Sequence, residues 1–111
     1  MKELKKIIII DGKKYLVQAP SVRKNKKYDV YYVFNNEDLN DPGLKENQFM
    51  KRYLLSYGDI RHQHYKDKWG YYKDLNHNDK TRRERYIKRH SKIGDITNPE
   101  SAAYWSLNYL W

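Results

Sequence analysis

The sequence contains no cysteine, only three prolines and five glycines. Without cysteine, a disulfide-bonded scaffold and a cysteine-ligated zinc site are excluded. Because glycine is so rare, the glycine-rich loops that bind nucleotide phosphates and the tight turn that presents a catalytic serine are missing as well. The longest aliphatic run, residues 7–10, is far below the about 18 residues that a membrane-spanning helix needs. These absences favour a reducing compartment such as the cytosol or the nucleus, and they predict no membrane partner.

Aromatic residues are the abundant hydrophobic class in this chain. The 111 residues include 12 tyrosines, three tryptophans and two phenylalanines. The length predicts one domain over residues 1–111. The mean hydropathy of −1.14 is low, but the aromatic content and clear strand patterns argue for a folded domain. We therefore expect a core built largely from tyrosine rings, whose hydroxyl groups need hydrogen-bond partners or a path to water.

The chain is strongly basic, with a formal net charge of +9 and a sequence pI near 9.6. A domain with this charge usually has an anionic partner, which can be nucleic acid, an acidic protein or an anionic membrane surface. The alternative is a well-solvated surface in an organism whose proteins are rich in Lys, Asn, Tyr and Ile. Charge alone does not decide between these two interpretations.

The N-terminal third of the sequence predicts three β-strands. Residues 5–10 and 13–18 flank Asp11-Gly12, which is a strong signal for a β-hairpin. Residues 28–34, with the sequence YDVYYVF, predict a third strand. The polar and acidic stretch 35–48 predicts an exposed loop.

The middle of the chain is harder to assign. Residues 49–57 predict a fourth strand, with a short helix as the alternative. Gly58 then permits a sharp turn or a close approach of two backbones. Residues 60–66 predict a fifth strand, and residues 68–78 an irregular, aromatic segment.

Two helices are expected in the C-terminal third. Residues 79–90 predict the first, capped by Asn76, Asn78 or Asp79. The second is expected to begin at Thr97 or Asn98, where Thr97 and Glu100 match a capping box, and to run to near Leu110. Together these elements predict an α+β fold, with a small antiparallel sheet of four to five strands followed by two C-terminal helices on one side.

The first of these helices carries a dense cluster of positive charge. Arginine can bind phosphate in a bidentate manner and lysine adds point charge, so the cluster predicts contacts to the nucleic-acid backbone. The alternative is a solvated helix paired with the acidic stretch 35–48. The basic loop 23–27 would add to the same surface. The candidate nucleic-acid-binding residues are Lys80, Arg82, Arg83, Arg85, Lys88, Arg89 and Lys92.

Two further patterns have chemical interpretations. The interleaved basic and aromatic residues of 51–72 allow stacking on unpaired bases, although alternating tyrosines in strands are more often half-buried packing. Histidines and aspartates in the second half allow a metal-dependent nuclease. His62 and His64 would share one face of the expected fifth strand. The compact signatures of such enzymes are absent, so structural hydrogen bonding is the preferred interpretation and no cofactor is predicted. The candidate catalytic residues are Asp59, Asp67, His77 and Asp79.

The second half of the chain also contains a series of short motifs in a fixed order. This series resembles a family of small uncharacterised basic proteins encoded by double-stranded DNA viruses, both giant viruses of eukaryotes and tailed phages. The resemblance implies a viral origin and a location in the virion or the host-cell interior, but no established activity. The motifs are Leu55-Ser56-Tyr57-Gly58-Asp59, Tyr65-Lys66-Asp67, His77-Asn78-Asp79-Lys80, the pattern Arg82-Arg83-x-x-Tyr86-x-x-Arg89-His90, and residues 101–111.

Three functions remain open at this point. The leading hypothesis is a non-enzymatic viral protein that contacts nucleic-acid backbone without sequence specificity. The first alternative is a structural virion protein that binds capsid or portal subunits through its aromatic surface and C-terminal helix. It is motivated by the cluster from Trp105 to Trp111, since tryptophan and tyrosine are favoured at interfaces. The second alternative is the small metal-dependent nuclease.

Overall fold

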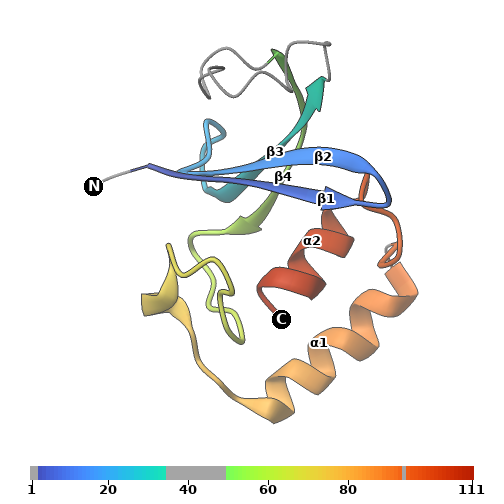
Figure 1. The fold of residues 1–111 in the computed structure, drawn as a ribbon. Helices are drawn as coiled ribbons and strands as arrows, with labels where there is room; N and C mark the ends of the chain where they lie inside the picture. The colour runs from blue at the N-terminus through green and yellow to red at the C-terminus, as the bar shows by residue number, and fades with distance from the viewer. Residues whose placement is uncertain (1–2, 35–49, 94) are drawn as a thin grey trace.

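A four-stranded antiparallel sheet forms the N-terminal half of the protein (Figure 1). The computed structural model describes residues 3–34, 50–93 and 95–111. The strands follow one another in the sheet in chain order, and the helical segments come after them. The elements are β1 (Leu4–Ile10), β2 (Lys13–Ala19), β3 (Lys26–Phe34), β4 (Met50–Asp59), the short 3₁₀-helix η3 (Lys73–Leu75), α1 (Lys80–Ile93) and α2 (Ala102–Tyr109).

This arrangement confirms the predicted α+β class and each of the first four strands. The short helix considered for residues 49–57 was wrong, because residues 50–57 belong to β4 and this strand pairs with β3. The loop predicted for 35–48 lies outside the described residues. Within the described ranges, no helix is long and apolar enough to cross a lipid bilayer.

The β1–β2 hairpin turns at Asp11 and Gly12, as predicted. Their φ angles are 51° and 80°, so both residues lie in the left-handed region. A two-residue turn with positive φ at both positions matches the right-handed twist of the two strands. This turn sets Ile10 opposite Lys13 and fixes the register of the whole pair.

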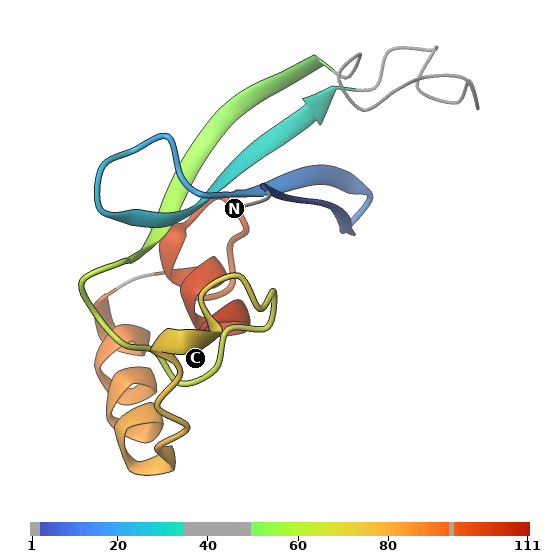
Figure 2. The same ribbon diagram turned by 90° about the vertical axis from the view of Figure 1, so that its left-hand side faces the viewer.

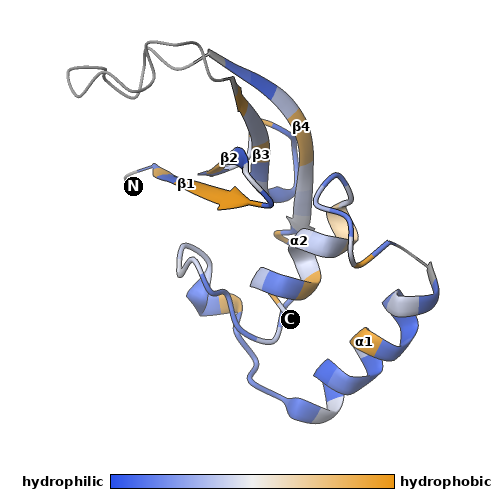
Figure 3. Cartoon of the chain, turned by 45° about the vertical axis from the view of Figure 1, so that its right-hand side comes forward, coloured by the Kyte–Doolittle hydropathy of each residue, from blue (hydrophilic) through white to orange (hydrophobic). Residues whose placement is uncertain are grey.

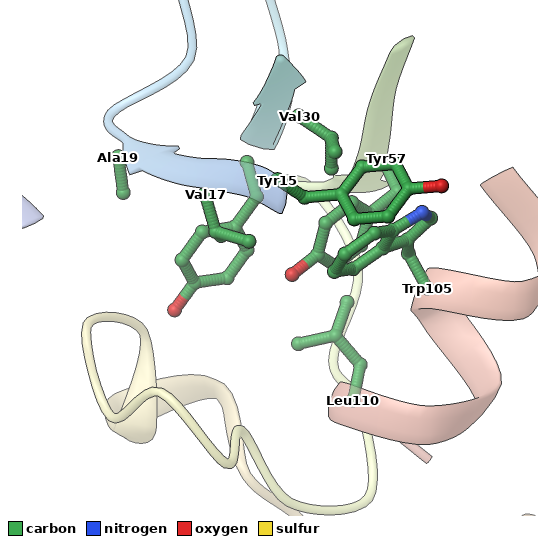
Figure 4. Close-up of a cluster of buried hydrophobic side chains, with 8 residues drawn as sticks. Tyr15, Val17, Ala19, Val30, Tyr57, Trp105 and Leu110 are labelled. Carbon is green, nitrogen blue, oxygen red and sulfur yellow. The ribbon is translucent and has the colours of Figure 1, made fainter. Parts of the chain in front are cut away.

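The main core lies on one face of the sheet and is largely aromatic, as predicted (Figure 4). Its residues alternate along each strand, because successive side chains of a strand point to opposite faces. Two of the core hydroxyl groups have hydrogen-bond partners: Tyr57 accepts a 2.7 Å hydrogen bond from the Trp69 indole, and Tyr28 donates to Asp67. The buried members are Tyr15, Val17, Ala19, Tyr28, Val30, Tyr57, Trp105 and Leu110.

The two helices occupy different positions relative to the sheet. α2 packs against β4 and places Trp105 in the core, whereas α1 lies beyond α2, away from the sheet (Figures 1 and 2). The Tyr86 ring of α1 stacks on the ring of Trp111 at 4.0 Å. The expectation that both helices cover one side of the sheet was therefore wrong for α1, which packs on the C-terminal segment.

The predicted fifth strand at residues 60–66 is not present. The chain turns directly after β4, where the backbone N–H of His62 donates to the carbonyl of Asp59 at 3.1 Å. A single bridge between His64 and Asn76 is the β-type pairing found in this stretch. His64 is consequently buried while His62 is exposed, so the two do not share a strand face.

The helix ends agree with the predictions only in part. Asp79 caps α1, because its Oδ1 accepts from the backbone N–H of Thr81 at 3.0 Å. α2 begins later than predicted, with Ser101 as its N-cap. The capping box with Thr97 does not form, because the backbone N–H of Glu100 donates to Asn98 and the Glu100 side chain accepts a 2.6 Å hydrogen bond from the Tyr32 hydroxyl. The Glu100 side chain that the capping box requires is thus engaged in a tertiary contact.

Candidate anion-binding site

The positive charge predicted for α1 is on the protein surface. Figure 3 shows the helix mainly in hydrophilic colours. Among the described residues, ion pairs join Lys5 to Glu3 and Arg61 to Asp59, and none involves α1. The charge of α1 is therefore not neutralised within the described part of the chain. Of the predicted nucleic-acid-binding residues, the exposed ones are Lys80, Arg82, Arg85, Lys88, Arg89 and Lys92.

Arg83 differs from the other basic residues of α1, because it is half-buried. Its Nε donates a 2.7 Å hydrogen bond to the backbone carbonyl of Trp111. Its guanidinium group also lies over the ring of Tyr65, 5.5 Å from the centroid. Arg83 thus fastens α1 to the C-terminal segment.

A cavity of about 420 Å³ lies between α1, the end of β4 and the C-terminal segment. It brings together parts of the chain that are far apart in the sequence. Nitrogen-bearing side chains dominate its polar lining, and one carboxylate, that of Asp59, is present. The basic residues at the cavity are Lys27, His62, Arg82, Arg89 and His90.

Lys27 is the buried cation of this cavity, with only 2% of its surface exposed. Its Nζ donates to the carbonyl of His62 at 3.0 Å and to Nδ1 of His64 at 2.8 Å. An ammonium group has three N–H donors, so one donor has no acceptor among the described residues. Burial lowers the pKa of Lys27 to about 8, against the opposing influence of Asp67 and Asp59. The side chain therefore carries its charge in most molecules at neutral pH.

His64 holds Lys27 in place. Because the ammonium of Lys27 can only donate, Nδ1 of His64 must accept, and the ring proton sits on Nε2. Nε2 donates to Oδ1 of Asn76 at 2.5 Å, and the same oxygen accepts from the backbone N–H of Asp67 at 2.8 Å. Burial, assisted by the charge of Lys27, lowers the pKa of His64. The imidazole is thus neutral at physiological pH and acts as an acceptor for Lys27.

Asp59, the carboxylate at the cavity, is paired within its own turn. Arg61 donates to it from Nε at 3.0 Å and from Nη2 at 2.7 Å. These hydrogen bonds hold the pKa of Asp59 well below its ordinary value. Since Arg61 offsets the charge of Asp59, the remaining lining of the cavity is positive.

The four candidate catalytic residues are engaged in separate contacts. Asp67 is 5% exposed and accepts from Tyr28 and from two backbone N–H groups. Nδ1 of His77 accepts from the backbone of Asp79, which caps α1, and Asp59 pairs with Arg61. In residues 3–34, 50–93 and 95–111, no three histidine, aspartate or glutamate side chains are placed to hold a metal ion. The contacts observed for these residues are structural hydrogen bonds and an ion pair, and Nε2 of His77 is buried without a hydrogen-bond partner among the described residues.

Aromatic residues of the 51–72 stretch also take part in packing. The Trp69 ring stacks on Tyr109 with centroids 4.6 Å apart, and Tyr72 meets the edge of Tyr28 at 5.3 Å. Half-buried packing, the alternative interpretation of this stretch, therefore accounts for these two side chains. Tyr57 is buried in the core and is inaccessible to a base, so stacking on bases stays a prediction for Tyr53, Tyr65 and Tyr71.

The roles of Lys27 and His64 at the cavity were missed by sequence reasoning. Lys27 was expected only as part of a basic loop, and His64 only as one of several polar histidines. The available signal was Gly58, for which a sharp turn or a close approach of two backbones was predicted, whereas the groups that approach it are side chains. Its φ is +75°, and a Cβ there would lie 2.8 Å from Cδ1 of Leu110 and 2.9 Å from Cδ of Lys27. Because Gly58 has no side chain, the side chains of Lys27 and Leu110 can both pack close to its backbone in β4.

Replacing Gly58 with alanine is expected to lower the free energy of unfolding by about 2–4 kcal/mol, from left-handed strain and from overpacking. Gly12→Ala is the matched control, because its φ is +80° but no atom lies within 4 Å of the added carbon. In the control, left-handed strain alone should lower the free energy of unfolding, by about 1–2 kcal/mol. Urea denaturation followed by circular dichroism measures both. Equal losses would show that the contact with Lys27 and Leu110 is unimportant.

Comparison with family models, with curated proteins and with solved structures finds no significant match for this chain. The function must therefore be inferred from the geometry and charge of the described residues.

Proposed function

We propose that this chain is a small basic viral protein that contacts nucleic-acid backbone without sequence specificity and catalyses no reaction. The observation that carries the proposal is the exposed face of α1, where basic side chains have no ion-pair partner among the described residues. The net charge of +9 supports the same partner. The ordered motifs of the second half, which resemble proteins of double-stranded DNA viruses, support the viral origin.

The position of α1 suits contact with a long polyanion. The helix lies on the outside of the molecule, with α2 between it and the sheet (Figure 1). Arginine and lysine side chains on its exposed surface can reach successive phosphates, and phosphate contacts position a protein without reading sequence. Binding is thus expected to tolerate any sequence.

The burial of the C-terminal aromatics argues against the structural virion alternative in its original form. Trp105 is 0% exposed and lies within the core of its own chain. Trp111 is half-buried and stacked on Tyr86. Trp105 is therefore inaccessible to a capsid or portal subunit, and the basic face of α1 is the better-supported surface.

The proposed binding is expected to weaken steeply with salt, because counterion release dominates contacts to phosphate. With about four phosphate contacts, affinity should fall about 100-fold between ~50 and ~200 mM salt. Fluorescence anisotropy with double-stranded DNA, single-stranded DNA and RNA measures this dependence and the substrate preference. A flat affinity over this range would overturn the proposal.

A charge-matched pair of variants locates the surface. The triple variant R82Q/R85Q/R89Q removes exposed charges of α1 and leaves Arg83, which fastens the helix, intact. We expect it to reduce the slope of log affinity against log salt by about 2 to 3. The control K5Q/K6Q/K13Q removes the same charge from three exposed lysines of the β1–β2 hairpin. An equal loss in both variants would mean that net charge, rather than α1, carries the binding.

A further inference from the structure

We propose that the cavity between α1 and the C-terminal segment binds a terminal phosphate monoester of a nucleic-acid strand. This inference rests on the proposed function and adds a specific ligand group to it. The exposed face of α1 would contact the strand, while the cavity would receive its phosphorylated end.

The lining has the composition of an anion site. Three cationic side chains, Lys27, Arg82 and Arg89, come from β3 and from α1, and His62 and His90 add further nitrogen atoms. Arg82 donates to Gln63 at 3.0 Å through one of its five N–H donors, so the others stay available. The charge of the single carboxylate at the cavity is offset by Arg61.

The cations are arranged by depth. Lys27 is 2% exposed and Leu110 is 1% exposed, so both lie at the bottom of the cavity. Arg82, Arg89 and His62 are exposed and form its rim. A ligand can reach Lys27 only if its charged group protrudes into the cavity while the rest of the molecule stays at the rim. A strand end has this shape, whereas an internal phosphate is flanked by chain on both sides.

The chemistry of a monoester also matches the donors. A phosphate monoester carries about −1.5 to −2 charges at pH 7 and three strongly accepting oxygens. The two arginine forks can pair with these oxygens in charge-assisted hydrogen bonds, and the positive charge of Lys27 adds to the attraction of the anion. Because His64 and the carbonyl of His62 already hold the ammonium of Lys27, little additional ordering is needed when the anion binds.

Oligonucleotides of one sequence test the inference, with 5′-phosphate, 3′-phosphate or hydroxyl groups at both ends. We expect one phosphorylated strand to bind the full-length protein about tenfold more tightly than the hydroxyl strand at ~150 mM salt. R89Q should abolish this preference, and so should K27M. K88Q is the control, because Lys88 is exposed on the same helix and does not line the cavity. It should keep the preference.

Each other outcome overturns a defined part of this reasoning. Equal affinity for all strands would reject the cavity as an end-binding site and leave the proposed function intact. Absence of binding by every strand would reject both. A preference that survives R89Q, an exposed position at which folding is not at risk, would place the end-binding site elsewhere. Competition by a nucleoside 5′-monophosphate as effective as the phosphorylated strand would assign the cavity to free nucleotides instead.

Discussion

Replacing Trp105 with alanine is expected to lower the free energy of unfolding by about 3–5 kcal/mol. Trp105 is fully buried and its ring contacts four tyrosines from β2, β4 and α2. The substitution removes this packing and leaves a large cavity between α2 and the sheet. Alanine itself favours helix, so the loss cannot come from a weaker α2.

The lost indole also leaves a backbone acceptor without its partner. Nε1 of Trp105 donates to the carbonyl of Pro99 at 2.7 Å. This hydrogen bond links the segment that precedes α2 to the buried tryptophan of the helix. Phenylalanine at this position would keep part of the ring packing but not the hydrogen bond. We therefore expect W105F to be intermediate between the wild type and W105A.

Urea denaturation followed by far-ultraviolet circular dichroism is the suitable measurement, because the chain contains other tryptophans that complicate fluorescence. The control is A102S, an exposed position on the same helix, which should change stability by less than about 0.5 kcal/mol. A W105A protein as stable as this control would contradict the placement of α2 against the sheet.

Replacing Asp67 with alanine is expected to cost a similar amount, about 3–5 kcal/mol, by a different mechanism. Its buried carboxylate accepts from the Tyr28 hydroxyl, from the backbone N–H of Trp69 at 2.9 Å and from that of Tyr72 at 2.8 Å. Removing the carboxylate leaves these donors without partners, and each buried unpaired donor costs about 1–3 kcal/mol.

The same variant should lower the pKa of Tyr28, because it removes two of the influences that raise this pKa. Burial, together with the hydrogen bond to Asp67 and its charge, raises the pKa of Tyr28. The exposed carboxylate of Asp74, in the neighbouring 3₁₀-helix η3, provides the control D74A, which should change stability by less than about 0.5 kcal/mol. If D67A were as stable as D74A, the loop from Asp67 to Tyr72 would not depend on the buried carboxylate.

The local elements were predictable where short-range chemistry decides the structure. The Asp11-Gly12 turn needs left-handed backbone at both residues, and this pair supplies it. Asp79 precedes a run of good helix formers and caps α1 through a local hydrogen bond. The stretch 60–66 has strand composition, but its chain turns after β4 and sends His64 inward to Lys27. Composition could not anticipate this, because the path of the stretch depends on a turn after β4 and on a contact between His64 and Lys27, which are 37 residues apart in the sequence.

The amino-acid sequence by itself determined the α+β class, the hairpin, the aromatic core and the basic helix. Each of these follows from side-chain patterning or local backbone preference, which act over a few residues. Only the tertiary structure decided which charges serve which purpose. In the folded chain, Arg83 donates to the carbonyl of Trp111 and Asp67 is buried by its own loop. Lys27 packs close to Gly58 and lines a cavity that α1 also lines. The physical reason is that burial and hydrogen-bond partners are set by segments distant in the chain, and these determine whether a charged side chain holds the fold together or remains free to bind.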